Sequence, residues 1–356
     1  MLRPGFWLIG LALAALLAAS AWLAFSRHTN DQPPAAVGDV LFVTNRQIDQ
    51  SASPEDRFDG RRGGVVQGRC QVGYRPIPLT RDLARSVEFF VPTDFQAVEE
   101  VELLTDTAFE AALASRPGAP VVLFVHGYSY GFDKTCRMGA DLQQMMGDEA
   151  TVVMFSWPSD ANPADYVADQ VDVEWSVPAL AATLERLVRH VGSARIKLLA
   201  HSLGTRGVLF SLARLELDEL PPPYAEHLVL LAPDYDAAAF EQQFAGIDRR
   251  VGRITLYASS KDTPLKLSET LHGYPRLGQA GDALTVIEGL QTIDVSRLGR
   301  YRPSGHEYFF YHPIAADDLI ESLVRGTPPE DRPHTRERIH EGQRYWALLD
   351  PKESTQ

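Results

Sequence analysis

Ser202 lies in a stretch whose residues could perform nucleophilic chemistry. Four of the five residues 196–200 before it are apolar and predict a buried parallel strand, and residues 208–215 after it predict a helix. A serine in a sharp turn between strand and helix presents its hydroxyl for attack on an acyl carbon. Small residues two before and two after it are needed there, because larger side chains at Ala200 and Gly204 would collide with the neighbouring strand and helix. The stretch predicts a nucleophilic serine, and the alternative is a simple N-cap.

Ser129 lies in a second candidate stretch. The sequence Gly127-Tyr128-Ser129-Tyr130-Gly131 matches the pattern G-x-S-x-G completely, whereas Ala200 replaces the first glycine of that pattern at Ser202. We expect no apolar helix directly after Ser129, because Phe132-Asp133-Lys134 intervenes before a helix at 136–146. Ser129 would also have no upstream His-Gly loop to donate to an oxyanion. These two points favour Ser202.

Three aspartates are candidates for the carboxylate that must follow the serine in chain order. Asp262 follows a strand predicted at 254–258, the second strand after that of the serine. Asp234 follows the intervening strand at 228–232 and is the runner-up, and Asp294 is a third candidate. A loop aspartate more often serves as a turn or cap residue. We choose Asp262 for the position of its strand.

His306 is the predicted general base. It follows the turn Pro303-Ser304-Gly305 and precedes a final helix at 315–324, as the order Ser, Asp, His requires. His272 and His312 also follow Asp262 and remain alternatives. His201 adjoins the serine, but its side chain should point away from that of Ser202.

Two backbone N–H groups should hold the oxyanion. One is that of Leu203, directly after the nucleophile, and the other is that of Tyr128, after a strand at 121–125. Gly127 lets the backbone turn so that the Tyr128 N–H faces the pocket. Gly127 and Gly204 are therefore positioning residues.

Neither a metal nor a cofactor is expected. The spacing of His306, Glu307 and His312 differs from the H-E-x-x-H of a zinc helix, so the two histidines would not share a helix face. No glycine-rich loop fits a nucleotide.

Strands and helices alternate along the chain, which predicts an α/β fold with a mostly parallel sheet and helices on both faces. Strands are expected at 40–44, 87–91, 121–125, 151–155, 196–200, 228–232 and 254–258, and residues 284–287 and 291–295 offer one or two more. Further helices are expected at 180–191 and around 240–244. Residues 51–73 should form a loop. Residues 233–252 leave room for one short helix, so we expect a minimal cap and an open site, partly covered by residues 46–74 or 157–177.

Residues 6–25 carry no charge and would span about 30 Å as a helix, the thickness of a bilayer core. They predict a transmembrane signal anchor, because the run stays apolar past Ala19-Ser20-Ala21, the cleavage site of the alternative signal peptide. Arg3 favours an exported body. The expected organisation is an anchor or signal peptide at 1–25, a linker at 26–38, a catalytic domain at 39–325 and a polar, peripheral tail at 326–356.

The composition limits the partners. A net charge of −13 argues against nucleic acid, which requires a basic face. Cys70 and Cys136 could form one disulfide in an exported domain.

The set of motifs resembles the α/β-hydrolase superfamily, and more closely a bacterial branch of uncharacterised α/β hydrolases, over about residues 40 to 325. The resemblance is carried by Leu41-Phe42-Val43-Thr44-Asn45-Arg46, Phe124-Val125-His126-Gly127-Tyr128, Phe155-Ser156-Trp157-Pro158-Ser159, Leu199-Ala200-His201-Ser202-Leu203-Gly204-Thr205-Arg206, Tyr257-Ala258-Ser259-Ser260-Lys261-Asp262 and Gly305-His306. It implies a Ser202–Asp262–His306 triad but no substrate.

These observations predict a serine hydrolase of carboxylic esters, tethered to a membrane by its N-terminal helix with the catalytic domain in the periplasm or envelope. The substrate would be an acyl ester, cleaved through an acyl-enzyme on Ser202. The rival interpretation is a catalytically silent scaffold that acts as an envelope binding protein.

Overall fold

The computed structural model describes residues 36–74, 96–162, 164–216, 220–299 and 304–350. Residues 38–72 and 98–356 form one compact unit, and residues 1–37 and 73–97 form another, most of which lies outside the described residues. The anchor expected at 6–25 and the strand expected at 87–91 also lie outside them. No helix in the described part of the chain is both long and apolar enough to cross a membrane.

The larger unit is built on one sheet of eleven strands in the order β10-β11-β9-β8-β7-β6-β4-β5-β1-β2-β3. The strands are β1 (Ala36–Ile48), β2 (Phe58–Tyr74), β3 (Gln96–Leu103), β4 (Val121–Val125), β5 (Thr151–Ser156), β6 (Ile196–His201), β7 (His227–Leu231), β8 (Ile254–Ala258), β9 (Leu290–Asp294), β10 (Thr335–His340) and β11 (Gln343–Leu348). In this spatial order, every neighbouring pair in the run β11-β9-β8-β7-β6-β4-β5-β1 is parallel. Strands β10 and β11 pair antiparallel at one edge of the sheet. The mostly parallel sheet is confirmed.

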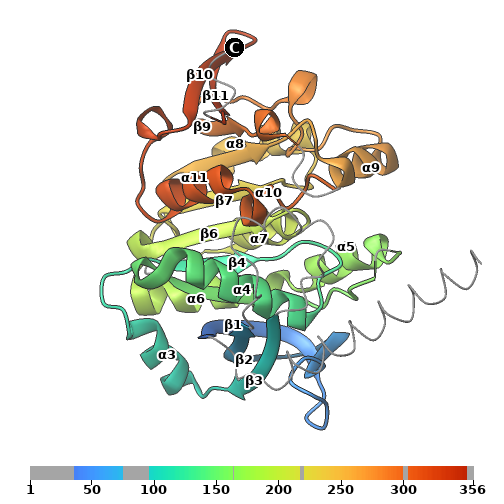
Figure 1. Ribbon diagram of the computed structural model, residues 1–356, viewed down its shortest axis with the longest axis vertical. Helices are drawn as coiled ribbons and strands as arrows, with labels where there is room; N and C mark the ends of the chain where they lie inside the picture. The colour runs from blue at the N-terminus through green and yellow to red at the C-terminus, as the bar shows by residue number, and fades with distance from the viewer. Residues whose placement is uncertain (1–35, 75–95, 163, 217–219, 300–303, 351–356) are drawn as a thin grey trace, which may run out of the picture. The chain divides into compact units, whose positions relative to one another are not determined.

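Helices cover the two faces of this sheet (Figure 1). They are α3 (Asp106–Ala114), α4 (Phe132–Met146), α5 (Tyr166–Trp175), α6 (Val177–Val191), α7 (Gly204–Arg214), α8 (Ala237–Asp248), α9 (Thr263–His272), α10 (Tyr308–Tyr311) and α11 (Pro313–Leu323). Helices α3, α6, α7 and α8 contact one another in sequence along one face, while α4 contacts α11 on the other. Because helices cover both faces, all residues of β4, β6, β7 and β8 are buried, which explains their predominantly apolar sequences.

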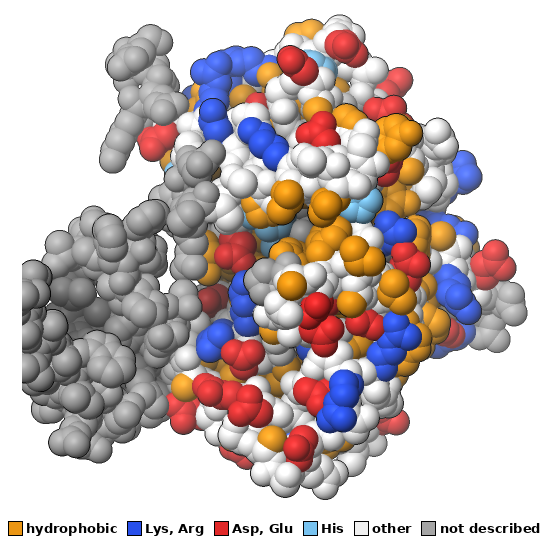
Figure 2. Space-filling model, turned by 90° about the vertical axis from the view of Figure 1, so that its right-hand side faces the viewer, with side chains coloured by type: hydrophobic (Ala, Val, Ile, Leu, Met, Phe, Trp, Pro, Cys, Tyr) orange, Lys and Arg blue, Asp and Glu red, His pale blue; other side chains and the backbone are white. Residues whose placement is uncertain are grey.

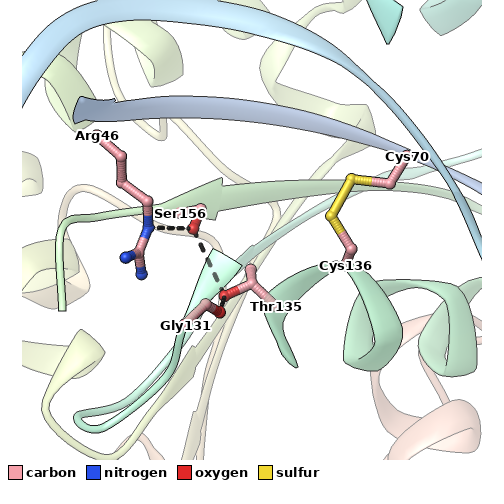
Figure 3. The surroundings of a disulfide bond; sticks show 6 residues. All are labelled: Arg46, Cys70, Gly131, Thr135, Cys136 and Ser156. Carbon is pink, nitrogen blue, oxygen red and sulfur yellow. Dashed lines mark hydrogen bonds between the residues drawn. A yellow bond between two sulfur atoms is a disulfide. The ribbon is translucent and has the colours of Figure 1, made fainter. Parts of the chain in front are cut away.

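Residues 58–74 form strand β2 instead of the expected loop. Its glycines are needed for close backbone approach: a Cβ at Gly68 would lie 2.1 Å from the carbonyl oxygen of Glu102, and one at Gly63 would lie 2.4 Å from that of Arg46. Cys70 on β2 forms a disulfide with Cys136 on α4 (Figure 3). The strand expected at 284–287 is absent, because a turn through Gly289 (φ 90°) delays strand formation until Leu290.

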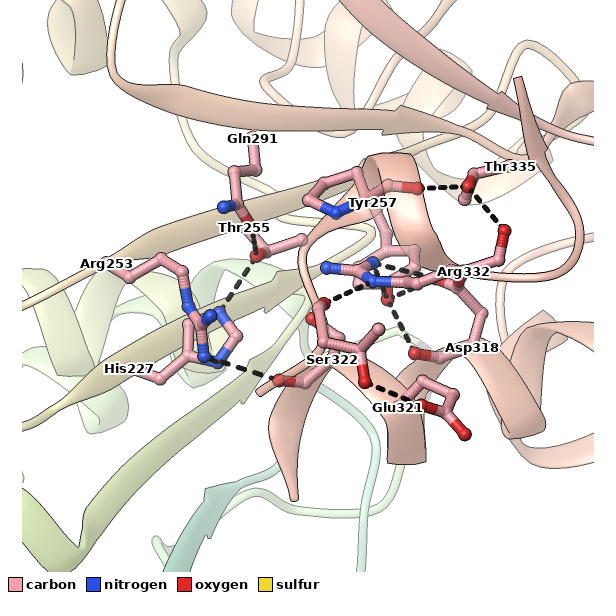
Figure 4. Close-up of polar contacts among 12 residues, drawn as sticks. His227, Arg253, Thr255, Tyr257, Gln291, Asp318, Glu321, Ser322, Arg332 and Thr335 are labelled. Atoms are coloured by element: carbon pink, nitrogen blue, oxygen red, sulfur yellow. Dashed lines mark hydrogen bonds and ion pairs between the residues drawn. The ribbon is translucent and has the colours of Figure 1, made fainter. Parts of the chain in front are cut away.

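The segment expected to be a peripheral tail adds β10 and β11 to the sheet, with Trp346 in register with Ile293 of β9. A buried ion pair holds its start: Arg332 Nη1 lies 3.1 Å from Asp318 Oδ2 of α11, and the Tyr257 hydroxyl donates to the same oxygen at 2.6 Å (Figure 4). The sequence did not predict these two strands, because they are mostly polar and exposed and contain few apolar residues that alternate with the polar ones.

Candidate active site

Ser202 lies in a two-residue turn between β6, which ends at His201, and α7, which begins at Gly204. Its φ of 51° is in the left-handed region, which non-glycine residues rarely occupy. Two hydrogen bonds hold this conformation: the Ser202 N–H donates to the Leu231 carbonyl at 3.0 Å, and the Ser202 carbonyl accepts the Asp234 N–H at 3.1 Å. The sharp strand–turn–helix predicted from the sequence is confirmed.

The turn packs directly against the loop that follows β4. A Cβ at Gly204 would lie 2.4 Å from the His126 carbonyl oxygen and 2.6 Å from that of Val125. A Cβ at Gly127 would lie 2.9 Å from the Cβ of Ser202. Both glycines are therefore required by close contact, and the loop that carries Tyr128 is adjacent to the serine.

Asp262 and His306 are hydrogen bonded, with 2.6 Å between Oδ2 and Nδ1. Asp262 is completely buried, and its other oxygen, Oδ1, accepts the Leu265 N–H at 2.9 Å as the N-cap of α9. Because an ionised carboxylate only accepts, the His306 hydrogen lies on Nδ1, and Nε2 of the neutral ring is left to accept a proton.

Electrostatics around His306 favour its protonated form. Burial lowers the pKa of His306, but the charge and hydrogen bond of Asp262, together with the charges of Glu307 and Asp234, outweigh burial and raise the pKa above its ordinary value. The ring of His201, the residue before the serine, lies 4.8 Å from the His306 ring between centroids. His306 therefore lies beside the turn that carries Ser202. Burial, followed by the charge of His306, lowers the pKa of His201 and keeps that ring neutral.

Asp234, the runner-up carboxylate, is engaged by other partners. Its Oδ1 accepts from Arg276 Nε at 2.7 Å and from Ser268 Oγ at 2.6 Å, and its Oδ2 accepts from the Tyr166 hydroxyl at 2.5 Å. The third candidate, Asp294, accepts the Ser296 N–H at 2.9 Å and serves a turn.

The alternative histidines lie in other surroundings. His272 ends α9, where its Nδ1 donates to the Ser268 carbonyl at 2.8 Å and its Nε2 accepts from Gln170 Nε2 at 2.8 Å. His312 precedes α11, and burial lowers its pKa. Among the described histidines, His306 is the one hydrogen bonded to Asp262.

Ser129 also has a positive φ, of 59°, and its N–H donates to Asp169 Oδ2 at 2.9 Å. Helix α4 begins at Phe132, not at residue 136. The expectation that no apolar helix follows Ser129 is therefore wrong, because the buried Phe132 starts that helix. Residues 126–131 nevertheless form a long connection from β4, in contrast to the two-residue turn at Ser202.

Sequence reasoning did not identify Arg46 and Asp169 as supports of the loop after β4. Arg46 is buried at the end of β1, where its Nη2 donates to the Tyr130 carbonyl at 2.6 Å and its Nη1 to the Ser159 carbonyl at 2.8 Å. Its Nε donates to Ser156 Oγ at 2.9 Å (Figure 3). Burial, against the charges of Asp169 and other carboxylates, lowers the pKa of Arg46 to about 10. The sequence feature that could have pointed to Arg46 is its position as a charged residue just after an apolar strand segment.

The two expected oxyanion donors, Leu203 and Tyr128, lie on the turn of Ser202 and on the adjacent loop after β4. Leu203 immediately precedes α7, so its N–H is among the helix N-terminal groups that lack an intrahelical acceptor. Tyr128 follows Gly127, and its half-buried ring contacts the Tyr166 ring at 5.2 Å.

Access to Ser202 is narrower than expected. Only α8 (Ala237–Asp248) lies between β7 and β8, as the short segment predicted. Ser202 nevertheless retains 4% exposure, so the expectation of an open site is not met. The loop after β4 packs against the serine, because a Cβ at Gly127 would lie 2.9 Å from the Cβ of Ser202.

One acidic group in the described residues has ligand atoms close enough for a metal: Asp160, Asp169 and Asp172. Protein groups already bind the carboxylates of Asp169 and Asp172. Asp169 accepts from Ser129, Ser159 and Asp160, and Asp172 pairs with Arg62 at 2.6 Å.

Comparisons with known proteins give a family and a set of distant structures. Residues 102–322 match the model of a family described as alpha/beta hydrolase of unknown function (DUF900). No curated protein matches the sequence. The structure is similar to the RedJ thioesterase of Streptomyces coelicolor, at 17% identity over 70% of this chain and 97% of that chain, with a TM-score of 0.32. It is also similar to a candidate esterase of Staphylococcus aureus, at 12% identity over 72% of this chain and 95% of that chain, with a TM-score of 0.36. A third similar structure is the phospholipase PlaB of Legionella pneumophila, at 14% identity over 65% of this chain and 68% of that chain, with a TM-score of 0.31. With the family model spanning more than half of its length, the chain belongs to the alpha/beta hydrolases of the DUF900 family.

Proposed function

We propose that this protein is a serine hydrolase of carboxylic esters that works through an acyl-enzyme on Ser202. The observation that carries the proposal is the 2.6 Å hydrogen bond between Asp262 and His306, beside a serine held at positive φ in a sharp turn. Acyl transfer requires a nucleophile, a base and an orienting carboxylate, and in this fold they follow in the chain order Ser, Asp, His.

In the proposed reaction, Ser202 Oγ attacks the acyl carbon while its proton passes to His306 Nε2. The Leu203 and Tyr128 N–H groups hold the negative oxygen of the tetrahedral intermediate. Collapse breaks the ester bond, and His306 returns the proton to the leaving alcohol. A water molecule then attacks the acyl-enzyme and gives its proton to His306, and the acid and free Ser202 are released. Asp262 orients the ring and stabilises its protonated form.

We further propose that residues 6–25 anchor the protein in a membrane and that the catalytic domain is exported. The Cys70–Cys136 disulfide supports export, because structural disulfides persist mainly in oxidising compartments.

Labelling with a fluorophosphonate probe tests the proposed function. The wild-type protein and the Ser129→Ala variant should react, and the Ser202→Ala variant should not, because the probe bonds to an activated serine. Folding of each variant is checked by circular dichroism. A folded wild-type protein that fails to react would instead favour a catalytically silent scaffold, and labelling lost only in Ser129→Ala would move the nucleophile to Ser129.

A further inference from the structure

Helices α5 and α9 carry most of the exposed large apolar side chains. Nine such side chains occur in the described residues, and six lie on these two helices or directly after α9. We refer to these six as the apolar rim: Val167, Val171, Trp175, Leu267, Leu271 and Tyr274. Their spacing of four residues along each helix places them on one face. Val167 is 71% and Leu271 64% exposed, whereas Trp175 at the end of α5 lies under the Arg62 guanidinium, 5.0 Å from the ring centroid.

The two helices touch, so the apolar rim forms one surface. The Tyr166 hydroxyl of α5 lies 3.1 Å from Ser268 Oγ of α9, and Gln170 Nε2 donates to His272 Nε2 at 2.8 Å. Figure 2 views the side on which Figure 1 shows α5 and α9, and hydrophobic side chains gather there around histidine. Exposed apolar side chains clustered in this way mark an interaction surface.

This surface borders the candidate active site. Helix α9 starts at the N-cap Asp262, which also binds His306. At the start of α5, Tyr166 donates to Asp234, whose N–H binds the Ser202 carbonyl. A partner that covers the apolar rim would therefore lie at the entrance to Ser202.

The charges near the rim do not favour an acidic or a basic partner. Lys266 is exposed on α9, whereas the acids of α5 are paired: Asp172 with Arg62 at 2.6 Å and Glu174 with Arg206 at 2.7 Å. The protein as a whole carries −13. An apolar partner without net charge fits this surface better than a charged protein or an anionic lipid.

The length of the chain before the described residues indicates what that partner is. Ten residues, 26–35, separate the apolar run at 6–25 from Ala36. Ten extended residues reach at most about 36 Å. With the run inserted in a bilayer, the catalytic domain would stay within about that distance of the lipid.

We propose that the apolar rim docks on an uncharged lipid surface, from which a long acyl chain enters the site of Ser202. The inference rests on the proposed ester hydrolysis for the acyl substrate and on the proposed anchor for the lipid partner, but the docking itself does not require hydrolysis. Leucine and tryptophan side chains on the face of an amphipathic helix bury into the boundary between headgroups and acyl chains.

A polarity-sensitive fluorophore tests the docking without requiring activity. The full chain is reconstituted in dioleoylphosphatidylcholine vesicles, with the fluorophore on Leu271→Cys or, as a control, on Ile339→Cys of the β10–β11 hairpin, which is 62% exposed. The Leu271 probe should shift to shorter wavelength and be quenched by spin-labelled lipid, and the Ile339 probe should not. Two results would overturn the proposal: a Leu271 probe that stays in water on vesicle-bound protein, or a shift that needs no lipid and grows with protein concentration, which would indicate a second copy.

Ester hydrolysis tests whether the acyl chain enters there. The Leu267→Ser/Leu271→Ser variant should lower the ratio of long-chain to short-chain rates about tenfold, because each lost leucine contact removes apolar burial. Ile339→Ser should keep the wild-type ratio. An unchanged ratio in the double variant would contradict the acyl-chain part of the proposal. If the wild-type protein hydrolyses no ester, the proposed function fails, whereas the fluorophore result still decides the docking.

Discussion

The loops around Ser129 and Ser202 are alike in several respects but differ in what surrounds each serine. Both follow a buried parallel strand, both precede a helix and both hold serine at positive φ, 59° and 51°. Ser129 has the complete G-x-S-x-G pattern, and Ser202 lacks its first glycine. The difference is in the carboxylates: Asp169 accepts the Ser129 backbone N–H, whereas Asp262 binds an imidazole beside Ser202. A local pattern predicts a turn, and the partners brought by distant strands decide its chemistry.

Replacing the two carboxylates should give the largest difference between the regions. Asp262→Asn should lower kcat by about 10³ to 10⁴, because the amide favours the wrong tautomer of His306. Asp169→Asn should lower kcat far less, because its carboxylate binds Ser129, Ser159 and Asp160 and not the catalytic histidine. Steady-state hydrolysis of a nitrophenyl ester measures both. Equal losses in the two variants would contradict the assignment of Asp262.

Removing the disulfide should affect stability more than activity. Cys136 lies on α4, the helix after Ser129, and its bond to Cys70 joins positions 66 residues apart. The Cys70→Ser/Cys136→Ser variant should lose about 2–4 kcal/mol of unfolding free energy, because the unfolded chain regains conformational freedom. Urea denaturation measures this loss. Because the turn at Ser202 is held by backbone contacts to β4 and β7, fluorophosphonate labelling of the folded variant should persist, and its loss would show that α4 also controls Ser202.

Glu307 contacts the loop of Ser129 and lies next to His306, so it should affect the pH dependence of kcat/KM. It accepts from the Tyr130 hydroxyl at 2.5 Å and from Lys134 at 3.0 Å, and its charge contributes to the raised pKa of His306. The base acts when neutral, so kcat/KM should rise with pH through that raised pKa. Glu307→Gln removes a negative charge and should move this acid limb to lower pH. A pH profile of kcat/KM, with Glu321→Gln as the control, detects it; a limb that moves to higher pH would contradict the electrostatic account.

Completing the pattern at Ser202 should have the smallest effect. Ala200 is buried in β6, in register with Val125 and Leu230. Ala200→Gly should leave kcat within about threefold and lower the unfolding free energy by about 0.5–1 kcal/mol, because glycine loses more backbone entropy in a strand. Hydrolysis and urea denaturation measure the two quantities. A large gain in kcat would mean that the missing glycine limits the enzyme.

Much of the sheet could be predicted from the sequence, because buried parallel strands are continuous apolar runs. Residues 121–125 and 254–258 coincide with β4 and β8. The pairing of Asp262 with His306 followed from chain order and strand position, which fix which loops meet at one edge of a parallel sheet.

Other features depend on contacts that no local pattern encodes. Residues 58–74 form β2 because their glycines allow close backbone approach, although the same glycines resemble a loop in sequence. Arg46 reaches the Tyr130 carbonyl across 84 positions, and spacing gives no sign of it. Tyr166 of α5 reaches Asp234 across 68 positions, a contact that depends on tertiary packing.

The position of β1 and of the β10–β11 hairpin at the two sides of the central sheet has a practical consequence for fragments of this protein. A polypeptide cut to residues 102–322, the region that matches the family, would lose both flanks of the sheet. Without β1 and β11, the edges of β5 and β9 would present unpaired N–H and C=O groups, which template intermolecular strand pairing. Such a fragment should precipitate, and the smallest soluble unit should extend from β1 through β11.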